Sequence, residues 1–311
     1  LHQVLLQGLL AAAPGSVVTG AQVTGCAQQG ERIVALCADG RRFEADVLIG
    51  ADGVHSALRR AVLDGEDLGT DAAQDTAARF TGLMAWRGVV PMARLPAAQR
   101  APLGVNWVGP GGHVITYPVR RGELLNFVAI VERDDWQGES WSDAGSPAEL
   151  HADLAGWHAE LHHIVDAIDT PFRWALLSRP PLPRWVQGRL VLIGDAAHPT
   201  LPFLAQGANM ALEDGLLIAR CLTEFTADDR PGGALGLDDT LARFVALRHP
   251  RTSRIVQGSA ENTRRFHNPV LADPTAAAAY IDREWEPTKV RLRYDWLFEY
   301  DATRLALEAT P

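Results

Sequence analysis

Short apolar runs separated by glycine- and proline-rich turns recur along the chain. Residues 190–193 are four consecutive apolar residues between turn formers, which is typical of a buried strand. Gly194 and Asp195 end this strand, and prolines in the next loop exclude a helix interior or a central strand there. From Gly207 onward, apolar positions recur at helical spacing. The pattern therefore predicts a strand, a Gly-Asp turn, a proline loop and a helix.

This strand-loop-helix layout favours an anionic or electron-rich ligand. The Asp195 carboxylate at the strand end can accept hydrogen bonds from a sugar hydroxyl, and Gly207 lets the backbone approach a ligand closely. Free N–H groups at the helix start, near Ala208 and Asn209, lie at the positive end of the helix dipole. An ordinary connection with an aspartate in its turn explains the same residues, so this stretch alone leaves both interpretations open.

A second stretch, residues 46–59, repeats the order of strand, glycine-rich turn and helix start. Its GADGVHSALR resembles the Asp-Gly motif of the class A flavoprotein aromatic hydroxylases. The segment GDAAHPTLPFLAQGANMALED, residues 194–214, resembles their Gly-Asp motif, and the separation of the two motifs also agrees. With segments 81–91 and 294–302 included, the chain is most similar to the salicylate, 3-hydroxybenzoate and 6-hydroxynicotinate hydroxylases of that family.

The resemblance implies that the chain binds FAD and uses NADH or NADPH as co-substrate. Asp52 and Gly53 would contact the FAD, and Arg59 would lie near the approach path of the nicotinamide, unless it is only a solvated helix charge. Val23 would lie beside the adenine, although an ordinary sheet residue explains it equally well. The implied flavin contacts of the Gly-Asp motif are Gly194, Asp195, Pro202, Gln206, Gly207, Ala208 and Asn209. His198 of the same motif is interpreted as a structural residue that holds the loop.

His113 and Tyr117 are the candidate catalytic residues. They lie four apart in one predicted strand, so both side chains point to the same face, which could line a cavity. In the resembled 3-hydroxybenzoate and 6-hydroxynicotinate hydroxylases, a His and a Tyr with this spacing lie at the substrate. A neutral histidine can accept the proton of a substrate phenol, directly or through Tyr117. The alternative is that both are ordinary sheet residues.

We expect an α/β fold in which an incomplete Rossmann-like FAD-binding domain is interleaved with an α+β substrate domain built on an antiparallel sheet. The expected boundaries are 1–75 and 185–265 for the FAD-binding domain, 76–184 for the substrate domain and 266–311 for a C-terminal helical tail. Residues 1–10 have helical spacing. The resemblance places a G-x-G-x-x-G turn for the FAD pyrophosphate before that helix, and the sequence contains no such turn. We therefore expect an N-terminally truncated sequence.

Composition and charge mainly exclude certain partners and sites. The 311 residues are 47% hydrophobic and 22% charged, which is ordinary for a globular protein, and the net charge of −9 argues against nucleic acid or membrane partners. No apolar run approaches the roughly 20 residues of a membrane span.

Three scattered cysteines indicate reduced thiols and a cytoplasmic protein. The histidines at 151, 158, 162 and 163 lack further ligands, so no metal site is predicted. The arginines at 248, 251, 254, 264 and 265 indicate a solvated face or the contact of a homodimer.

The resulting hypothesis is an FAD-dependent, NAD(P)H-using monooxygenase. It would hydroxylate a phenolic or hydroxy-heteroaromatic acid with O2, through the flavin C4a-hydroperoxide that the resemblance implies. One alternative keeps the fold but oxidises or epoxidises a non-aromatic polyketide or isoprenoid, which needs no base for a phenol. A second alternative is a non-catalytic flavin-binding fragment.

Overall fold

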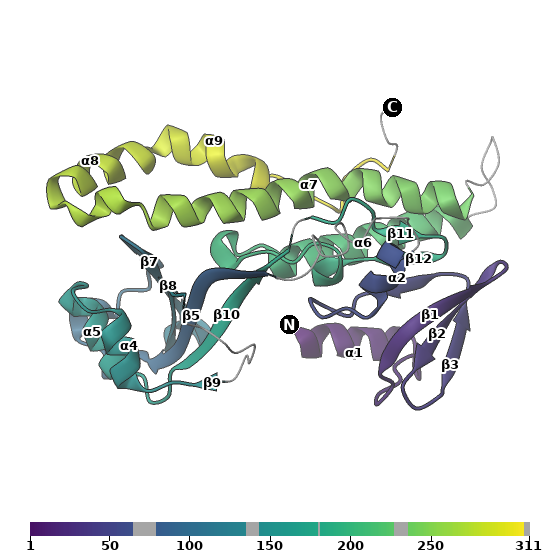
Figure 1. Cartoon of the computed structure of the whole chain (residues 1–311), viewed down its shortest axis with the longest axis horizontal. Helices are drawn as coiled ribbons and strands as arrows, with labels where there is room; N and C mark the ends of the chain where they lie inside the picture. Colours follow the sequence, from purple (N-terminus) through teal and green to yellow (C-terminus); the bar gives the residue numbers. More distant parts are fainter. Residues whose placement is uncertain (65–78, 135–142, 180, 227–235, 308–311) are drawn as a thin grey trace.

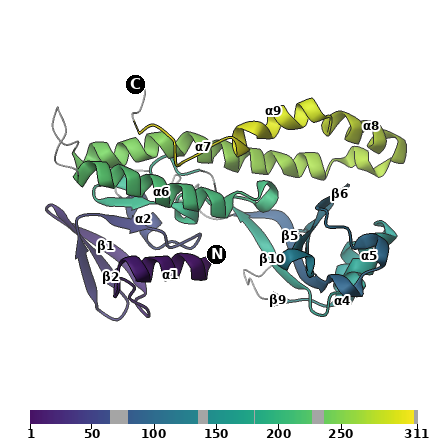
Figure 2. The same ribbon diagram turned by 180° about the vertical axis from the view of Figure 1, so that it is seen from behind.

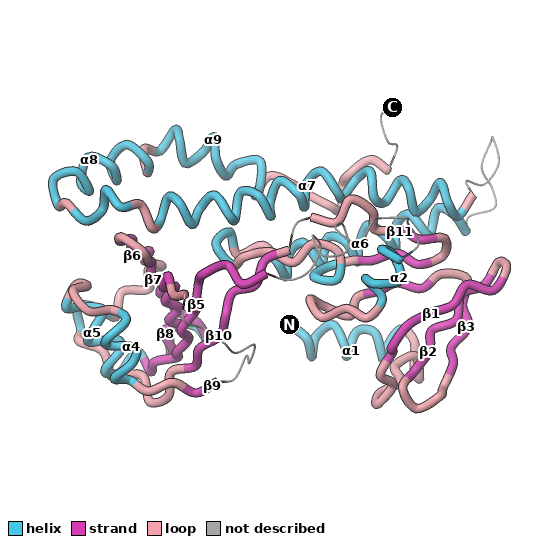
Figure 3. The backbone as a smooth tube through the Cα atoms, in the orientation of Figure 1, coloured by secondary structure: helices cyan, strands magenta, loops and turns pink. Residues whose placement is uncertain are grey.

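The computed structural model describes residues 1–64, 79–134, 143–179, 181–226 and 236–307. Two groups of strands lie on the same side of one long helix, α7 (Leu237–Phe266), which extends over both groups (Figure 1). The view from behind shows the same arrangement (Figure 2). A mixture of helix and sheet, as the sequence predicts, is confirmed (Figure 3).

The first group of strands follows helix α1 (His2–Ala12). Strands β1 (Val23–Gln29), β2 (Arg32–Cys37) and β3 (Arg42–Ala45) form an antiparallel sheet. The turn before β3 contains Gly40 at φ +84°, a left-handed conformation that favours glycine. The helix predicted at the start of the chain is therefore confirmed.

A second, smaller sheet brings the two sequence motifs together. It consists of β11 (Val186–Gln187), β12 (Leu190–Leu192) and β4 (Leu48–Gly50), with β12 and β4 parallel. Parallel neighbours end at the same edge of a sheet. The turn after β4, which leads to α2 (Leu58–Asp64), therefore lies beside the turn after β12.

The other group is a six-stranded antiparallel sheet. Its order is β6 (Val105–Gly109), β7 (Gly112–Val119), β8 (Leu124–Glu132), β5 (Arg79–Pro91), β10 (Phe172–Ser178) and β9 (Asp143–Ala144). Helices α4 (Pro147–Asp153) and α5 (Ala159–Asp166) cover one face around Trp86 and Phe127. Against the opposite face pack Leu201 and Phe203 of the Gly-Asp motif, and Phe266 at the end of α7. The predicted antiparallel sheet is therefore confirmed.

Helices α6 to α9 form a layer of their own beside the sheets. Helix α6 (Gly207–Thr226) packs along α7, and α8 (Pro274–Glu284) and α9 (Pro287–Phe298) fold back along the end of α7 nearest the large sheet (Figure 1). None of the helices in the described ranges combines the length and apolar character needed to cross a membrane. The domain boundaries expected from the sequence stay a prediction.

Candidate active site

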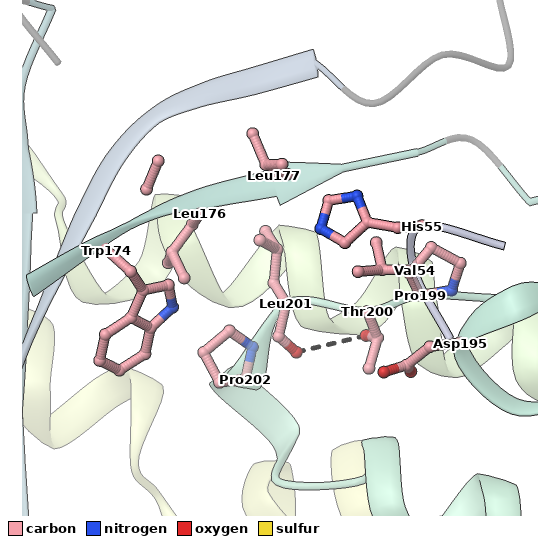
Figure 4. A pocket seen from close by; sticks show the side chains of 11 residues that line it. Val54, His55, Trp174, Leu176, Leu177, Asp195, Pro199, Thr200, Leu201 and Pro202 are labelled. Carbon is pink, nitrogen blue, oxygen red and sulfur yellow. Dashed lines mark hydrogen bonds between the residues drawn. The ribbon is translucent and has the colours of Figure 1, made fainter. Parts of the chain in front are cut away.

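Two adjoining cavities lie at the two motifs. The larger, of about 640 Å³, is lined by residues of both motifs and by the start of α6. The smaller, of about 160 Å³, lies between β10 and the proline loop (Figure 4). Asp195, Thr200 and Pro202 line both cavities. A molecule in either cavity would therefore contact these same three residues.

Glycine and alanine form most of the wall of the larger cavity. Gly53 and Gly194 have φ values of +79° and +60°, which residues with a Cβ rarely adopt, so both turns depend on glycine. A Cβ on Gly194 would lie 3.3 Å from the Cβ of Ala211 in α6. Gly207 and Ala208, in the first turn of α6, complete this wall. The first N–H groups of a helix have no partner within it, so here they face the cavity with the positive end of the dipole.

A buried network of charges holds the Gly-Asp turn in place. Asp214 of α6 is fully buried and accepts hydrogen bonds from the Gly194 N–H at 2.9 Å and from His198 Nε2 at 2.6 Å. Its other oxygen accepts one from Arg248 Nε at 2.6 Å. Burial alone raises the pKa of Asp214, but the hydrogen bond and charge of His198 and the charge of Arg248 outweigh it and hold the pKa below its usual value. The structural role predicted for His198 is confirmed.

Arg248 corrects one prediction from the sequence. It was expected on a solvated face or at a dimer contact, but it is 0% exposed and paired with both Asp214 and Glu213. Its Nη1 lies 2.8 Å from Glu213 Oε2, and Arg251 binds the same carboxylate at 2.9 Å. A buried guanidinium is tolerated only when its charge and N–H groups are matched in this way.

Asp52 and Arg59 both form hydrogen bonds within the two motifs. The Asp52 carboxylate accepts hydrogen bonds from Ser56 Oγ and from the N–H groups of Ala57 and Leu58, and so caps α2. Arg59 is 3% exposed, and its Nη1 donates to the carbonyls of Ala196 and Ala197 in the Gly-Asp motif. Burial, followed by the charge of Arg179, lowers the Arg59 pKa to about 10. The alternative of a solvated helix charge at Arg59 is therefore wrong, and the residue ties the two motifs together.

The smaller cavity has a mostly apolar wall with polar groups at one end. Trp174, Leu176, Leu201 and Pro202 form the apolar part, while His55 and Asp195 lie at the polar end (Figure 4). Asp195 is exposed to the cavity, and surrounding protein raises its pKa through burial, an effect that the charge of His198 reduces. Sequence analysis gave His55 no role, and its place two residues after Gly53 was the signal that could have indicated it.

The structure does not bring His113 and Tyr117 into this cavity. His113 in β7 is 1% exposed, and its ring contacts the ring of Phe203 with a centroid distance of 4.9 Å. Tyr117 lies on the same strand but is 43% exposed. Neither is among the residues that line the two cavities. Their catalytic role stays a prediction.

The remaining predicted contacts divide into two groups. Gly53, Gly194, Asp195, Pro202, Gly207 and Ala208 line the larger cavity. Gln206 is buried just before α6, Asn209 is exposed in its first turn, and Val23 is partly buried against the core that contains β12. None of these three, nor Asp52, is a wall residue of either cavity. In the described residues, no three histidine, cysteine or acidic side chains are grouped as a metal site would need.

A glycine-walled cavity with a carboxylate and a helix start, beside a small apolar cavity, is typical of a protein that binds a nucleotide cofactor next to a small ligand. The family model for the FAD binding domain matches residues 1–259, so the chain belongs to this family. The chain is 36% identical over 303 residues to 3-amino-4-hydroxybenzoate 2-monooxygenase PtnB3 of Streptomyces platensis, covering 97% of this chain and 70% of the relative. Its resemblance to FAD-dependent aromatic hydroxylases is thereby confirmed.

Further similarities agree. The chain is 35% identical over 297 residues to a salicylate hydroxylase of Pseudomonas putida, covering 91% of this chain and 64% of the relative. A solved salicylate hydroxylase substrate complex matches with a TM-score of 0.76 at 28% identity, over 97% of this chain and 73% of the solved one. The chain thus spans between about three fifths and three quarters of these proteins.

The residues of the larger cavity fit FAD. Its wall consists largely of glycine and alanine, whose small side chains leave room for a flat ring system. The Asp195 carboxylate can accept hydrogen bonds from ribityl or ribose hydroxyls, and the N–H groups at the start of α6 can donate to a ring carbonyl.

Proposed function

We propose that this chain forms the catalytic part of an NAD(P)H-dependent monooxygenase that hydroxylates a phenolic or hydroxy-heteroaromatic acid. The observation that carries this function is the wall that the two cavities share at Asp195, Thr200 and Pro202. An aromatic ring in the smaller cavity would meet the cofactor in the larger one across these residues. The names of the relatives, which act on aminohydroxybenzoate and salicylate, support this class of substrate.

Each part of the site has a stated task. FAD, when bound and reduced by NADH or NADPH, supplies the activation of O2. Asp195, Gly207 and Ala208 would hold and orient it. The apolar side chains of Trp174 and Leu176 would bind the ring and exclude water, which otherwise diverts oxygen chemistry to peroxide. His113, alone or with Tyr117, would take the proton of the phenol.

The same hypothesis includes the domain boundaries: the FAD-binding unit comprises residues 1–75 and 185–265, and the substrate unit comprises residues 76–184.

The hypothesis also includes the location and the oligomeric state. The protein works in the cytoplasm and forms a homodimer. Light scattering of the purified enzyme across a concentration series measures the last point directly, since a mass that stays at one protomer excludes the dimer.

The test fills the smaller cavity. Leu176→Trp places a large ring among the wall residues of that cavity, so we expect KM for the aromatic acid to rise at least tenfold with flavin binding unchanged. Val89→Trp is the matched control, because Val89 lies in the same sheet, is half exposed and lines neither cavity. Substrate-dependent NADH and NADPH oxidation would be measured with salicylate, 3-hydroxybenzoate, 6-hydroxynicotinate and 3-amino-4-hydroxybenzoate.

Two results would contradict the proposed function. An unaltered KM in Leu176→Trp would remove the smaller cavity from substrate binding. Oxidation of a non-aromatic polyketide or isoprenoid, with no turnover of any aromatic acid, would favour the alternative that keeps the fold and changes the substrate.

A further inference from the structure

A hollow of about 290 Å³ lies between the C-terminal half of α7 and helix α9, which runs alongside it (Figure 1). Three arginines contribute to its wall: Arg254 and Arg265 from α7, and Arg293 from α9. The rings of Tyr294 and Trp296 also line it, and we call it the arginine hollow. None of its wall residues lines either cavity at the two motifs, so it is a separate site.

The Arg254 guanidinium offers hydrogen-bond donors to an external ligand. It lies over the Trp296 ring, 3.7 Å from the ring centroid. Stacking occupies a face of the planar guanidinium, whereas its N–H groups lie in the plane and point outward. In the described part of the chain, Arg254 has no carboxylate partner. The indole therefore holds this side chain in place while its N–H groups stay available.

Positive charge exceeds negative charge around the arginine hollow. Arg265 and Arg293 share one carboxylate, that of Glu284, with N···O distances of 3.8 Å and 3.1 Å. A second carboxylate, Glu261, lines the hollow itself. With Arg254 included, three guanidinium groups meet two carboxylates, although the whole chain has a net charge of −9. A stacked guanidinium beside further arginines suits a small oxyanion, which accepts paired hydrogen bonds from such groups.

Asn262 connects the arginine hollow to the proline loop. Its side chain lines the hollow and is 1% exposed. Its Oδ1 accepts hydrogen bonds from Arg265 Nη1 and from the Tyr294 hydroxyl, and its Nδ2 donates to the Phe203 carbonyl at 3.1 Å. Phe203 directly follows Pro202, which lines both cavities at the motifs. One buried amide therefore contacts the wall of the hollow and the loop that borders the cofactor cavity.

We propose that the arginine hollow binds a small ligand that carries an oxyanion, a phosphate or a carboxylate, and that this ligand weakens flavin binding through Asn262. An oxyanion in the hollow competes with Asn262 Oδ1 for the N–H groups of Arg265. Loss of this donor weakens the hydrogen bond from Asn262 to the Phe203 carbonyl, because linked hydrogen bonds strengthen one another. This site goes beyond the function proposed above, since no step depends on which aromatic acid is hydroxylated.

The first experiment measures anion binding without turnover. The FAD-loaded enzyme is titrated by calorimetry with inorganic phosphate, glucose 6-phosphate or acetate, at an ionic strength held constant with sodium chloride. The three ligands distinguish free phosphate, a phosphate ester and a carboxylate as the source of the oxyanion. Arg254→Gln removes the stacked charge, whereas Arg264→Gln removes an equal charge from an exposed residue of α7 outside the hollow. We expect Kd to rise about tenfold or more in Arg254→Gln and to stay within about twofold in Arg264→Gln.

The second experiment measures the coupling to the cofactor. FAD affinity is determined from the quenching of flavin fluorescence, with and without a saturating concentration of the anion that binds. We expect the anion to weaken FAD binding about fivefold or more, and FAD to weaken anion binding by the same factor, because coupling is reciprocal. In Asn262→Ala, which keeps all three arginines, the anion should still bind but FAD affinity should no longer respond to it.

The results that would overturn the proposal are distinct. Absence of binding by all three ligands, or equal Kd values in Arg254→Gln and Arg264→Gln, would remove the oxyanion site. Anion binding with unchanged FAD affinity, or an unchanged response in Asn262→Ala, would remove the coupling through Asn262. Hydroxylation of an aromatic acid is tested separately by Leu176→Trp and does not depend on either result.

Discussion

Replacing Asp214 by asparagine tests whether the buried charge network sets the shape of the cofactor cavity. One Asp214 oxygen accepts from Gly194 and His198, and the other accepts from Arg248. An asparagine has only one carbonyl oxygen, so its NH2 group must oppose at least one of these donors. Among the described residues, the change also leaves the fully buried Arg248 with Glu213 as its one remaining carboxylate partner.

The expected loss is large. Breaking a buried ion pair by removing one charge typically costs about 3–5 kcal/mol, a large share of the roughly 5–15 kcal/mol by which folded domains are stable. Because the Gly194 N–H loses its anchor, we expect weaker flavin binding in addition to lower stability. Urea denaturation monitored by tryptophan fluorescence gives the free energy of unfolding, and quenching of flavin fluorescence gives the affinity.

Glu213→Gln is the matched control. Glu213 also pairs with Arg248, but it is more exposed, and its ion pairs in the described part of the chain are with Arg248 and Arg251 and not with the Gly-Asp turn, so its replacement should cost less and leave flavin affinity nearly unchanged. A free energy of unfolding for Asp214→Asn within about 1 kcal/mol of the unmodified protein would refute the reasoning.

Two further predictions concern the same region and the buried histidines. Gly194→Ala should cost about 1–2 kcal/mol in unfolding free energy and weaken flavin binding, because alanine is strained at φ +60°, whereas Gly215→Ala in α6, where a Cβ meets nothing, should leave flavin binding unchanged. The His113 pKa of about 3 lies below the ordinary 6.5, so the unfolded chain binds a proton first as pH falls. Stability should therefore be full above pH 6.5 and decline below it by about 1.4 kcal/mol per pH unit. Urea titrations at pH 7 and pH 5 should show this decline, and an equally steep decline in His113→Phe would contradict it.

The cofactor cavity could be predicted because its signals are local. Each motif carries its own strand, turn glycine and helix start, and the parallel pairing of β4 and β12 brings the two turns together. The sequence therefore indicated Gly53, Gly194, Asp195 and Gly207 without any knowledge of long-range contacts. The structural role of His198 could be predicted for the same reason, because its hydrogen-bond partner Asp214 belongs to the same motif.

Contacts between distant residues were not predictable in this way. The hydrogen bond between Glu132 and His267 joins residues 135 positions apart, and no periodicity connects them. Arg248 looked solvated because charged residues on a long helix usually are, and its buried partner Asp214 lies on another helix. Strand alternation predicts that His113 and Tyr117 share one face of β7, but it does not tell which of the two side chains other residues cover: His113 is buried and Tyr117 is exposed.

Incorporation of ¹⁸O from ¹⁸O2 into an aromatic acid tests the central claim most directly. The flavin-loaded enzyme would be given NADH or NADPH, ¹⁸O2 and each hydroxybenzoate or hydroxynicotinate in turn. The mass of the product would be measured by mass spectrometry. The account predicts one ¹⁸O atom on the ring of at least one substrate, and loss of this product in Leu176→Trp. Oxidation of NADH or NADPH that yields only hydrogen peroxide with every aromatic acid would contradict the account.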